Sequence, residues 1–189
     1  KVWVGGAQRD IDLLRKIDII VRSMLTDSLL SSSKVNYESL MNRDLDVNRL
    51  CFLAMRIIKR AFKDPELKKH LGIDYSELSD SLRLVNLMEK IADESKRISR
   101  FNKENKIQNK HIEELNKIYN KITEDYLNVM KAYHSNDISK AYIVSENHRS
   151  IFTVCNNYTD KNRDFVIEKI IDKLKEIESC NVDMARIIY

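Results

Sequence analysis

Glycine and proline are scarce in this sequence, with three glycines and one proline among 189 residues. A protein built from β-sheets needs many tight turns, and glycine and proline supply most of them. The scarcity therefore argues against a sheet-based fold. The chain contains instead 33% charged and 43% hydrophobic residues, which suits helices with one apolar side and one solvent-facing side. We predict an all-α protein.

Cysteine is also rare, and Cys51, Cys155 and Cys180 lie far apart in the chain. An odd, widely spaced set does not form a disulfide framework, so we expect reduced core residues in a cytoplasmic protein. The longest wholly apolar run, LCFLAM at 50–55, is far shorter than the roughly 20 residues needed to span a bilayer. We therefore expect no membrane span, and no signal-peptide pattern is present.

The chain has no strong excess of one charge, because its net charge is +4 and its basic residues are spread out. The nearest approach to a basic cluster is Lys103, Lys106 and Lys110, which Glu104 and Glu113 interrupt. Such a face is usually solvated, so the composition argues against nucleic-acid binding by this chain alone.

Residue groups that carry enzyme chemistry are lacking as well. Gly5 and Gly6 have neither the preceding strand nor the following Lys-Ser/Thr of a phosphate-binding loop. His148 and Cys155 lie two helical turns apart, too far for a nucleophile and its base. A ferritin-like di-metal enzyme requires Glu-x-x-His on two helices, and that motif does not occur. We expect that the protein is not an enzyme.

Apolar residues recur with the helical period, most clearly at 82–98, LRLVNLMEKIADESKRI. Residues 168–184 repeat this apolar frame 86 positions later, so that Met88 corresponds to Leu174. A helix that returns with its frame intact indicates a duplicated unit.

A second pair of segments repeats at a different offset. Arg49 and Phe52 correspond to Arg149 and Phe152, which lie 100 positions later. The two offsets differ by 14 residues, the length of the segment FKDPELKKHLGIDY at 62–75, which the second half lacks. A duplicated three-helix unit with one insert explains both offsets.

We therefore predict six long helices in two antiparallel three-helix bundles, residues 10–103 and 107–189, after a linker or the end of a preceding domain at 1–9. A short extra helix is predicted near 65–71, between an N-cap at Asp64 and a terminating Gly72. The long helices are expected at Asp10–Leu30, after an N-cap at Asn36, and at Ser76–Asn102, Gln108–Tyr133, Ile138–Tyr158 and Asp164–Ile188.

Tyr119, Tyr126 and Tyr133 recur every seven residues on the fourth of these helices. This spacing puts the three rings on one helix face. Such a ladder either packs in the interior or forms a seam with a partner helix, and both interpretations stay open.

Glu89 and Asp93 lie one turn apart on the third long helix, so their side chains stack on one face. Carboxylates that converge can hold a hard cation. The alternative is a solvated face on which Asp93 pairs with Arg97, four residues later. In the second half Lys175 and Ser179 take the corresponding positions.

Two segments stand out by their sequence: DVNRLCFLAMRIIKRAFKDPELKKHLGI at 46–73 and LRLVNLMEKIADESKRI at 82–98. Both resemble the PhoU family of phosphate-uptake regulators, and in particular its archaeal branch. The branch's Glu-Arg-Ile-Ala-Asp pattern is similar to EKIAD at 89–93. Its pattern of an acidic residue, Asp-Arg-Leu and a later Arg is filled by Asp44, Asn48, Arg49, Leu50 and Arg56, so Asn48 departs from the aspartate.

The resemblance implies a regulator made of two three-helix bundles. Its partner would be the ATPase subunit of a phosphate ABC transporter or a signalling protein such as a sensor histidine kinase, and a homo-oligomer is also open. The iron or zinc that some members hold on acidic pairs would fall here on Asp44, Glu89 and Asp93 in the first repeat.

Three alternatives to this function stay open. Members of the archaeal branch often place an AbrB-like DNA-binding domain before the helices. A transcriptional regulator, which would contact nucleic acid only through such an N-terminal domain, is therefore one alternative. A carboxylate metal-binding bundle is another, and a purely structural domain without a ligand is a third.

Overall fold

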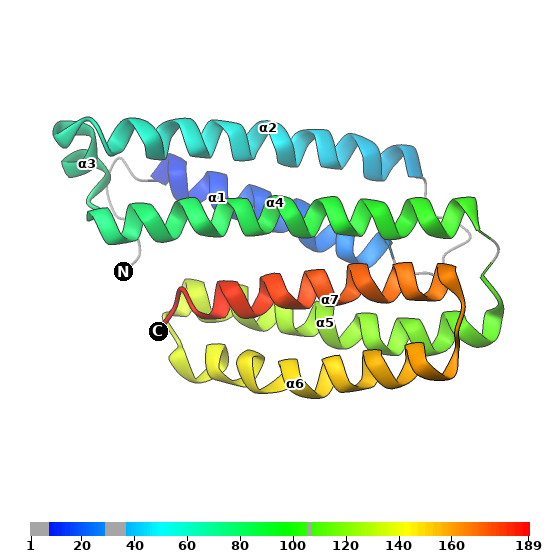
Figure 1. The fold of residues 1–189 in the computed structure, drawn as a ribbon. Coiled ribbons are helices and arrows are strands. Elements are labelled where there is room, and N and C mark those ends of the chain that lie inside the picture. The colour runs from blue at the N-terminus through cyan, green and yellow to red at the C-terminus, as the bar shows by residue number, and fades with distance from the viewer. Residues whose placement is uncertain (1–7, 29–36, 106) are drawn as a thin grey trace.

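The computed structural model describes residues 8–28, 37–105 and 107–189 and contains seven helices and no strand in these ranges. Helices α1, α2 and α4 form one antiparallel bundle, and α5, α6 and α7 form a second beside it (Figure 1). The predicted all-α class, with six long helices and one short one, is confirmed. The helices are α1 (Gln8–Asp27), α2 (Tyr37–Ala61), α3 (Pro65–Leu71), α4 (Tyr75–Glu104), α5 (Asn109–Ser135), α6 (Ile138–Lys161) and α7 (Phe165–Ala185).

Both ends of the short helix α3 lie where the sequence predicts them. The Asp64 side chain accepts a hydrogen bond from the Leu67 amide, and Pro65 opens α3. Gly72 ends α3 with a φ of 69°, the left-handed conformation that glycine adopts without strain. The predicted N-cap Asn36 and the end of the first helix beyond Ser28 lie outside the described residues.

Helix ends without a predicted cap differ by a few residues. Helix α6 continues to Lys161, three residues past the predicted Tyr158, and α7 ends at Ala185 rather than Ile188. Helix α1 already begins at Gln8, inside the stretch predicted as a linker, of which residues 1–7 lie outside the described ranges. In the part of the chain that the structure describes, no helix is long and apolar enough to cross a membrane.

The three cysteines are core residues, as predicted. Cys51, Cys155 and Cys180 are buried and free of disulfides. Burial raises the pKa of Cys51 and of Cys180 to about 12 and that of Cys155 to about 11. The thiols therefore stay protonated at neutral pH, and a protonated thiol is a poor nucleophile.

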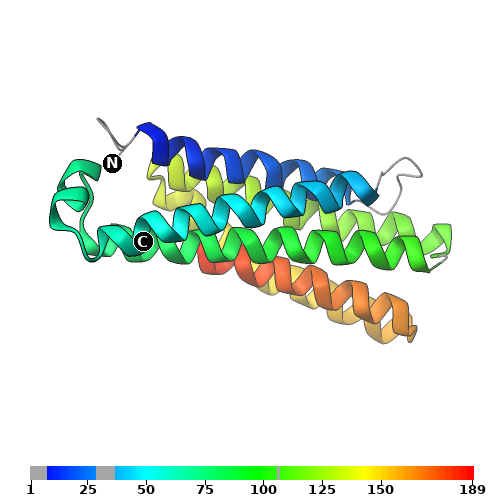
Figure 2. The same cartoon turned by 90° about the horizontal axis from the view of Figure 1, so that it is seen from above.

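The two bundles meet along α4 and α7, which run antiparallel side by side (Figures 1 and 2). Arg83 pairs with Asp183 across this seam, and Lys90 pairs with Glu176. Glu176 follows Lys90 by 86 positions and is thus its counterpart in the duplicated frame. When two equivalent helices run antiparallel, equivalent residues contact each other only near the twofold axis that relates the helices. A pseudo-twofold axis between the two bundles therefore passes close to the pair of Lys90 and Glu176.

The tyrosine ladder of α5 forms a second seam between the bundles. The Tyr126 hydroxyl donates a 3.0 Å hydrogen bond to Asp18 of α1, and the Tyr119 hydroxyl lies 2.5 Å from that of Ser28, just beyond α1. Tyr126 is fully buried, and this burial and the Asp18 charge hold the pKa of its phenol well above the usual range. The hydroxyl therefore remains a donor, and the two interpretations of the ladder, packing and helix seam, both hold.

We predict that Tyr126→Phe lowers the free energy of unfolding by about 1–2 kcal/mol, because buried Asp18 loses one donor, although it keeps Arg22 at 2.6 Å. Urea denaturation followed by circular dichroism measures this change. Tyr142→Phe is the matched control, because Tyr142 is 60% exposed, and it should leave stability unchanged. Equal stability of the two variants would contradict a structural role for the Tyr126 hydroxyl.

Candidate functional site

The three predicted site residues lie on facing sides of α2 and α4. Asp44, on α2, is 4% exposed, while Asp93 is partly buried on α4. The ammonium of Lys96 lies between them and donates 2.7 Å hydrogen bonds to Asp44 Oδ2 and to Asp93 Oδ1. Lys96 was not among the predicted site residues, although its position three residues after Asp93 is within pairing distance on a helix.

Glu89 interacts through its charge with Asp44 and Asp93. Burial raises the pKa of its carboxyl group, and the charges of Asp93 and Asp44 raise it further. The structure thus brings together the three carboxylates that the sequence pattern selected. It also shows that one lysine neutralises two of them.

This arrangement does not fit an iron or zinc ion. A metal ion needs several free carboxylate or imidazole ligands that converge on one point, whereas the point between Asp44 and Asp93 is taken by the Lys96 ammonium. Asn48 adds its amide nitrogen 3.5 Å from Asp44 Oδ2, which is a donor and not a ligand. Among the described residues no group of three or more His, Cys, Asp or Glu side chains is arranged to hold a metal. Metal binding at Asp44, Glu89 and Asp93 stays a prediction.

A second acidic group, which the sequence analysis missed, lies inside the second bundle. Asp125 of α5 is 2% exposed and Glu178 of α7 is fully buried. Asn147 of α6 donates a 2.8 Å hydrogen bond to Asp125 Oδ1, and Asn181 of α7 donates one of 3.2 Å to Glu178 Oε2. His148 of α6 completes the group, with its Nδ1 atom 3.9 Å from Glu178 Oε1.

Several polar atoms of this group have no hydrogen-bond partner among the described residues: Asp125 Oδ2, Glu178 Oε1, Asn181 Oδ1 and His148 Nδ1. Burial raises the pKa of Asp125 to about 6, and burial together with the Asp125 charge raises that of Glu178 to about 8. Burial and the nearby Arg186 lower the pKa of His148. At neutral pH Glu178 is thus mostly protonated and His148 neutral, whereas Asp125 is mostly ionised, so the group carries about one negative charge.

The helical period does contain a signal for these two acids. Glu178 follows buried Leu174 by four residues, and Asp125 follows buried Ile122 by three. Both therefore occupy positions of the apolar stripe. A carboxyl group at a core position is the feature that identifies them.

We predict that stability falls as pH rises from about 5 to 8. The folded chain keeps a proton on Glu178 up to about pH 8, whereas the unfolded chain releases it near its ordinary pKa of about 4.3, so unfolding releases protons and rising pH favours it. Glu178→Gln removes the Glu178 part of this dependence, so the fall in unfolding free energy should shrink by on the order of 2 kcal/mol. A smaller part remains, because burial also raises the pKa of Asp125.

The measurement is urea denaturation at several pH values for both proteins. His134 and His148, whose pKa values are lowered mainly by burial, act in the opposite direction and cancel in the difference between the two proteins. Glu113→Gln, at an exposed position of α5, is the control. An identical pH profile for wild type and Glu178→Gln would show that Glu178 is charged in the folded state.

Lys96→Met should lower the free energy of unfolding by at least about 2 kcal/mol, because it leaves the buried Asp44 carboxylate without its cation. The double variant Asp44→Asn, Lys96→Met should recover most of the loss, since the uncompensated charge is then gone. Lys59→Met, on the exposed face of α2, is the control. A single variant as stable as this control would mean that the Lys96 contacts contribute nothing.

Comparisons with known proteins place these features in a family context. Residues 14–101 match the PhoU domain. The crystal structure of PhoU from Pseudomonas aeruginosa is similar to this one, with a TM-score of 0.79 at 13% sequence identity, over 96% of this chain and 94% of that chain. No curated protein matches the sequence. In sequence the first bundle is therefore similar to the PhoU domain, and the whole chain shares the fold of the Pseudomonas protein.

Proposed function

We propose that this protein is a PhoU-like regulator of phosphate uptake that acts by binding other proteins and not by catalysis. The observation that carries the proposal is the match of residues 14–101 to the PhoU domain. The whole-chain similarity to PhoU from Pseudomonas aeruginosa adds the second bundle to that match. The proposed site of action is the cytoplasm, and the proposed partner is a phosphate transporter ATPase subunit or a signalling protein.

An apolar stripe on the outer face of α2 supports protein binding. Met41, Leu45 and Phe52 are 38%, 48% and 63% exposed. Their spacing of four and seven residues puts them on one side of the helix. Large side chains that gather on a solvent-facing helix surface are typical of interaction sites, whereas single exposed ones are not.

Regulation by such a protein needs no chemistry of its own. A bound regulator shifts a partner between two conformations by as much as its affinities for the two differ. The rigid double bundle would bind one conformation of the partner more tightly and so hold it in a state with reduced uptake.

The test is purification of the tagged, full-length protein from cells grown with and without phosphate. We expect a phosphate-transporter ATPase subunit or a phosphate-signalling protein to co-purify, in amounts that depend on phosphate. We also expect that deletion of the gene abolishes the reduction of phosphate uptake that occurs when phosphate is plentiful. The variant Leu45→Ser, Phe52→Ser should weaken co-purification, and Thr153→Ser, at an exposed position of α6, is the control. Unchanged uptake in the deletion strain would refute the proposal.

A further inference from the structure

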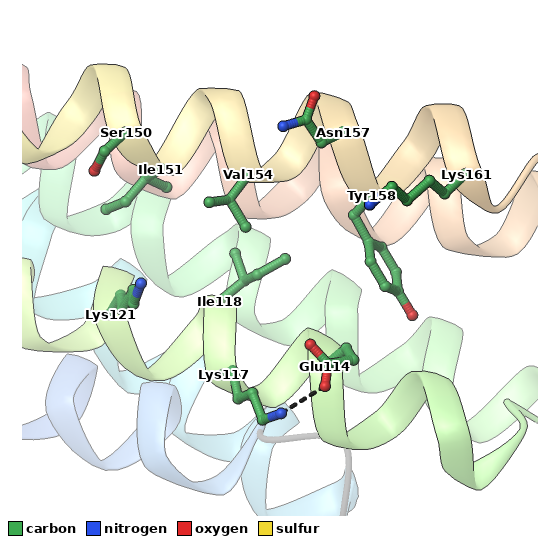
Figure 3. Close-up of a pocket in the computed structure, with 10 residues that line it drawn as sticks. All are labelled: Glu114, Lys117, Ile118, Lys121, Ser150, Ile151, Val154, Asn157, Tyr158 and Lys161. Atoms are coloured by element: carbon green, nitrogen blue, oxygen red, sulfur yellow. Dashed lines mark hydrogen bonds and ion pairs between the residues drawn. The ribbon is translucent and has the colours of Figure 1, made fainter.

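A pocket of about 300 Å³ lies between α5 and α6, on the second bundle. Its apolar lining consists of Ile118 from α5 and of Ile151 and Val154 from α6, whose side chains point toward one another (Figure 3). Val154 is 42% exposed, so part of this lining is accessible from solvent.

Lysines surround this apolar strip. Lys117 and Lys121 come from α5 and Lys161 from α6, and all three are exposed (Figure 3). The carboxylate in the lining, Glu114, is paired with Lys117 at 2.5 Å. Lys121 and Lys161 make no ion pair within the described ranges. The pocket therefore carries an excess of positive charge.

The corresponding groove of the first bundle has a different character. It lies between α1 and α2 and is lined by Lys16, Ile19, Ile20, Asp46, Arg49 and Leu50. In the duplicated frame, buried Ile17 and Val21 correspond to buried Ile118 and Ile122, so Lys16 corresponds to Lys117 and Ile20 to Lys121.

At the offset of 100 positions that relates Arg49 to Arg149, Leu50 corresponds to Ser150 of the α5–α6 pocket. Where the first bundle has Ile20 and Leu50, the second has a lysine and a serine. The two grooves thus share a position in the fold but differ in charge, because the second has exchanged apolar side chains for cationic and polar ones.

The spread of the lysines indicates the class of ligand. Lys117 and Lys121 are one helical turn apart, a rise of about 6 Å, and Lys161 lies on the other helix, toward the opposite end of the view in Figure 3. Ammonium groups distributed along a groove do not converge on one small anion. They suit carboxylates that are themselves spaced along a chain.

We propose that the α5–α6 groove binds an acidic amphipathic segment of a partner protein. Its carboxylates pair with Lys117, Lys121 and Lys161, and an apolar side chain of the segment covers Ile118 and Val154. This inference rests on the proposed function, since it names the surface and the chemistry of one binding event. The net charge of +4 adds a long-range attraction for such a segment.

Two synthetic helical peptides test the proposal. They share the same leucines, and their polar positions are all glutamate in one peptide and all lysine in the other. We expect the glutamate peptide to shift the amide resonances of α5 and α6 around the groove in ¹⁵N-labelled protein, and the lysine peptide to shift none. Binding should weaken steeply as salt rises.

Charge reversal provides the matched comparison. The variant Lys117→Glu, Lys121→Glu, Lys161→Glu should bind the glutamate peptide at least about tenfold more weakly. The control Lys16→Glu, Lys59→Glu, Lys131→Glu changes the same net charge at exposed positions outside the groove and should bind as wild type does. Equal binding by both variants, shifts outside α5 and α6, or no binding of the glutamate peptide would overturn the proposal.

Three further measurements distinguish other ligands of the groove from an acidic segment, and failure of the groove from failure of the proposed function. If inorganic phosphate alone produced the same shifts and displaced the peptide, the groove would be a site for small anions and the proposal would be wrong. If the protein associated with itself through the groove, the ligand would be a second copy of this chain and not a partner protein. In cells, a groove variant that still retains the regulatory partner would refute the groove while the proposed function stands. A wild-type protein that retains no partner would refute the function itself.

Discussion

Helices α4 and α7 are each buried on two sides, inside their own bundle and against the other bundle. In α4 the side chains of Leu84, Val85, Met88, Ile91 and Ala92 are nearly or completely inaccessible, and together they cover far more than the single stripe of a surface helix. The matching residues of α7 are equally buried. A three-helix bundle that ended at such a helix would expose a broad apolar surface to water, so each bundle requires the other. The antiparallel seam and its pseudo-twofold relation follow from this requirement.

The features that could be predicted from the sequence are those that depend on residues close together in the chain. A frame of apolar residues that recurs after 86 positions identifies both central helices, because each position on a helix face follows from the spacing alone. Asp64 and Gly72 mark the ends of α3 because a side-chain cap and a left-handed residue act within one turn. Where no such residue is present, as at the end of α7, packing at the edge of the bundle decides where the helix stops.

The polar contacts between helices could not be predicted in the same way. Asp44 and Asp93 were identified from their types and spacing, but the position of Lys96 between them depends on how α2 lies against α4. Lys90 lies between Glu89 and Asp93 in the sequence, and Lys96 follows them. Lys90 pairs with the other bundle, whereas Lys96 pairs with α2. Chain spacing does not distinguish these two directions. Asp125 and Glu178 were missed for another reason. They do not repeat an acidic position of the first half, since Glu178 corresponds to Ala92 in the duplicated frame.

The two halves keep one scaffold and differ in where they place charge. In the first bundle three carboxylates lie between α2 and α4 with a lysine of their own, and the outer groove is lined by two cations, one carboxylate and three apolar side chains. In the second bundle the acids are inside, and the outer groove is basic. Helix α6 contributes both to the buried acidic group and to the exposed groove of the second bundle. Asn147 and His148 contact the buried acids, and Ser150 and Ile151, less than one turn later, line the groove. A change in the charge of Glu178 therefore acts on the same turn of α6 that presents the groove, so the pH dependence of the core and the affinity of the groove for an acidic segment are expected to be linked.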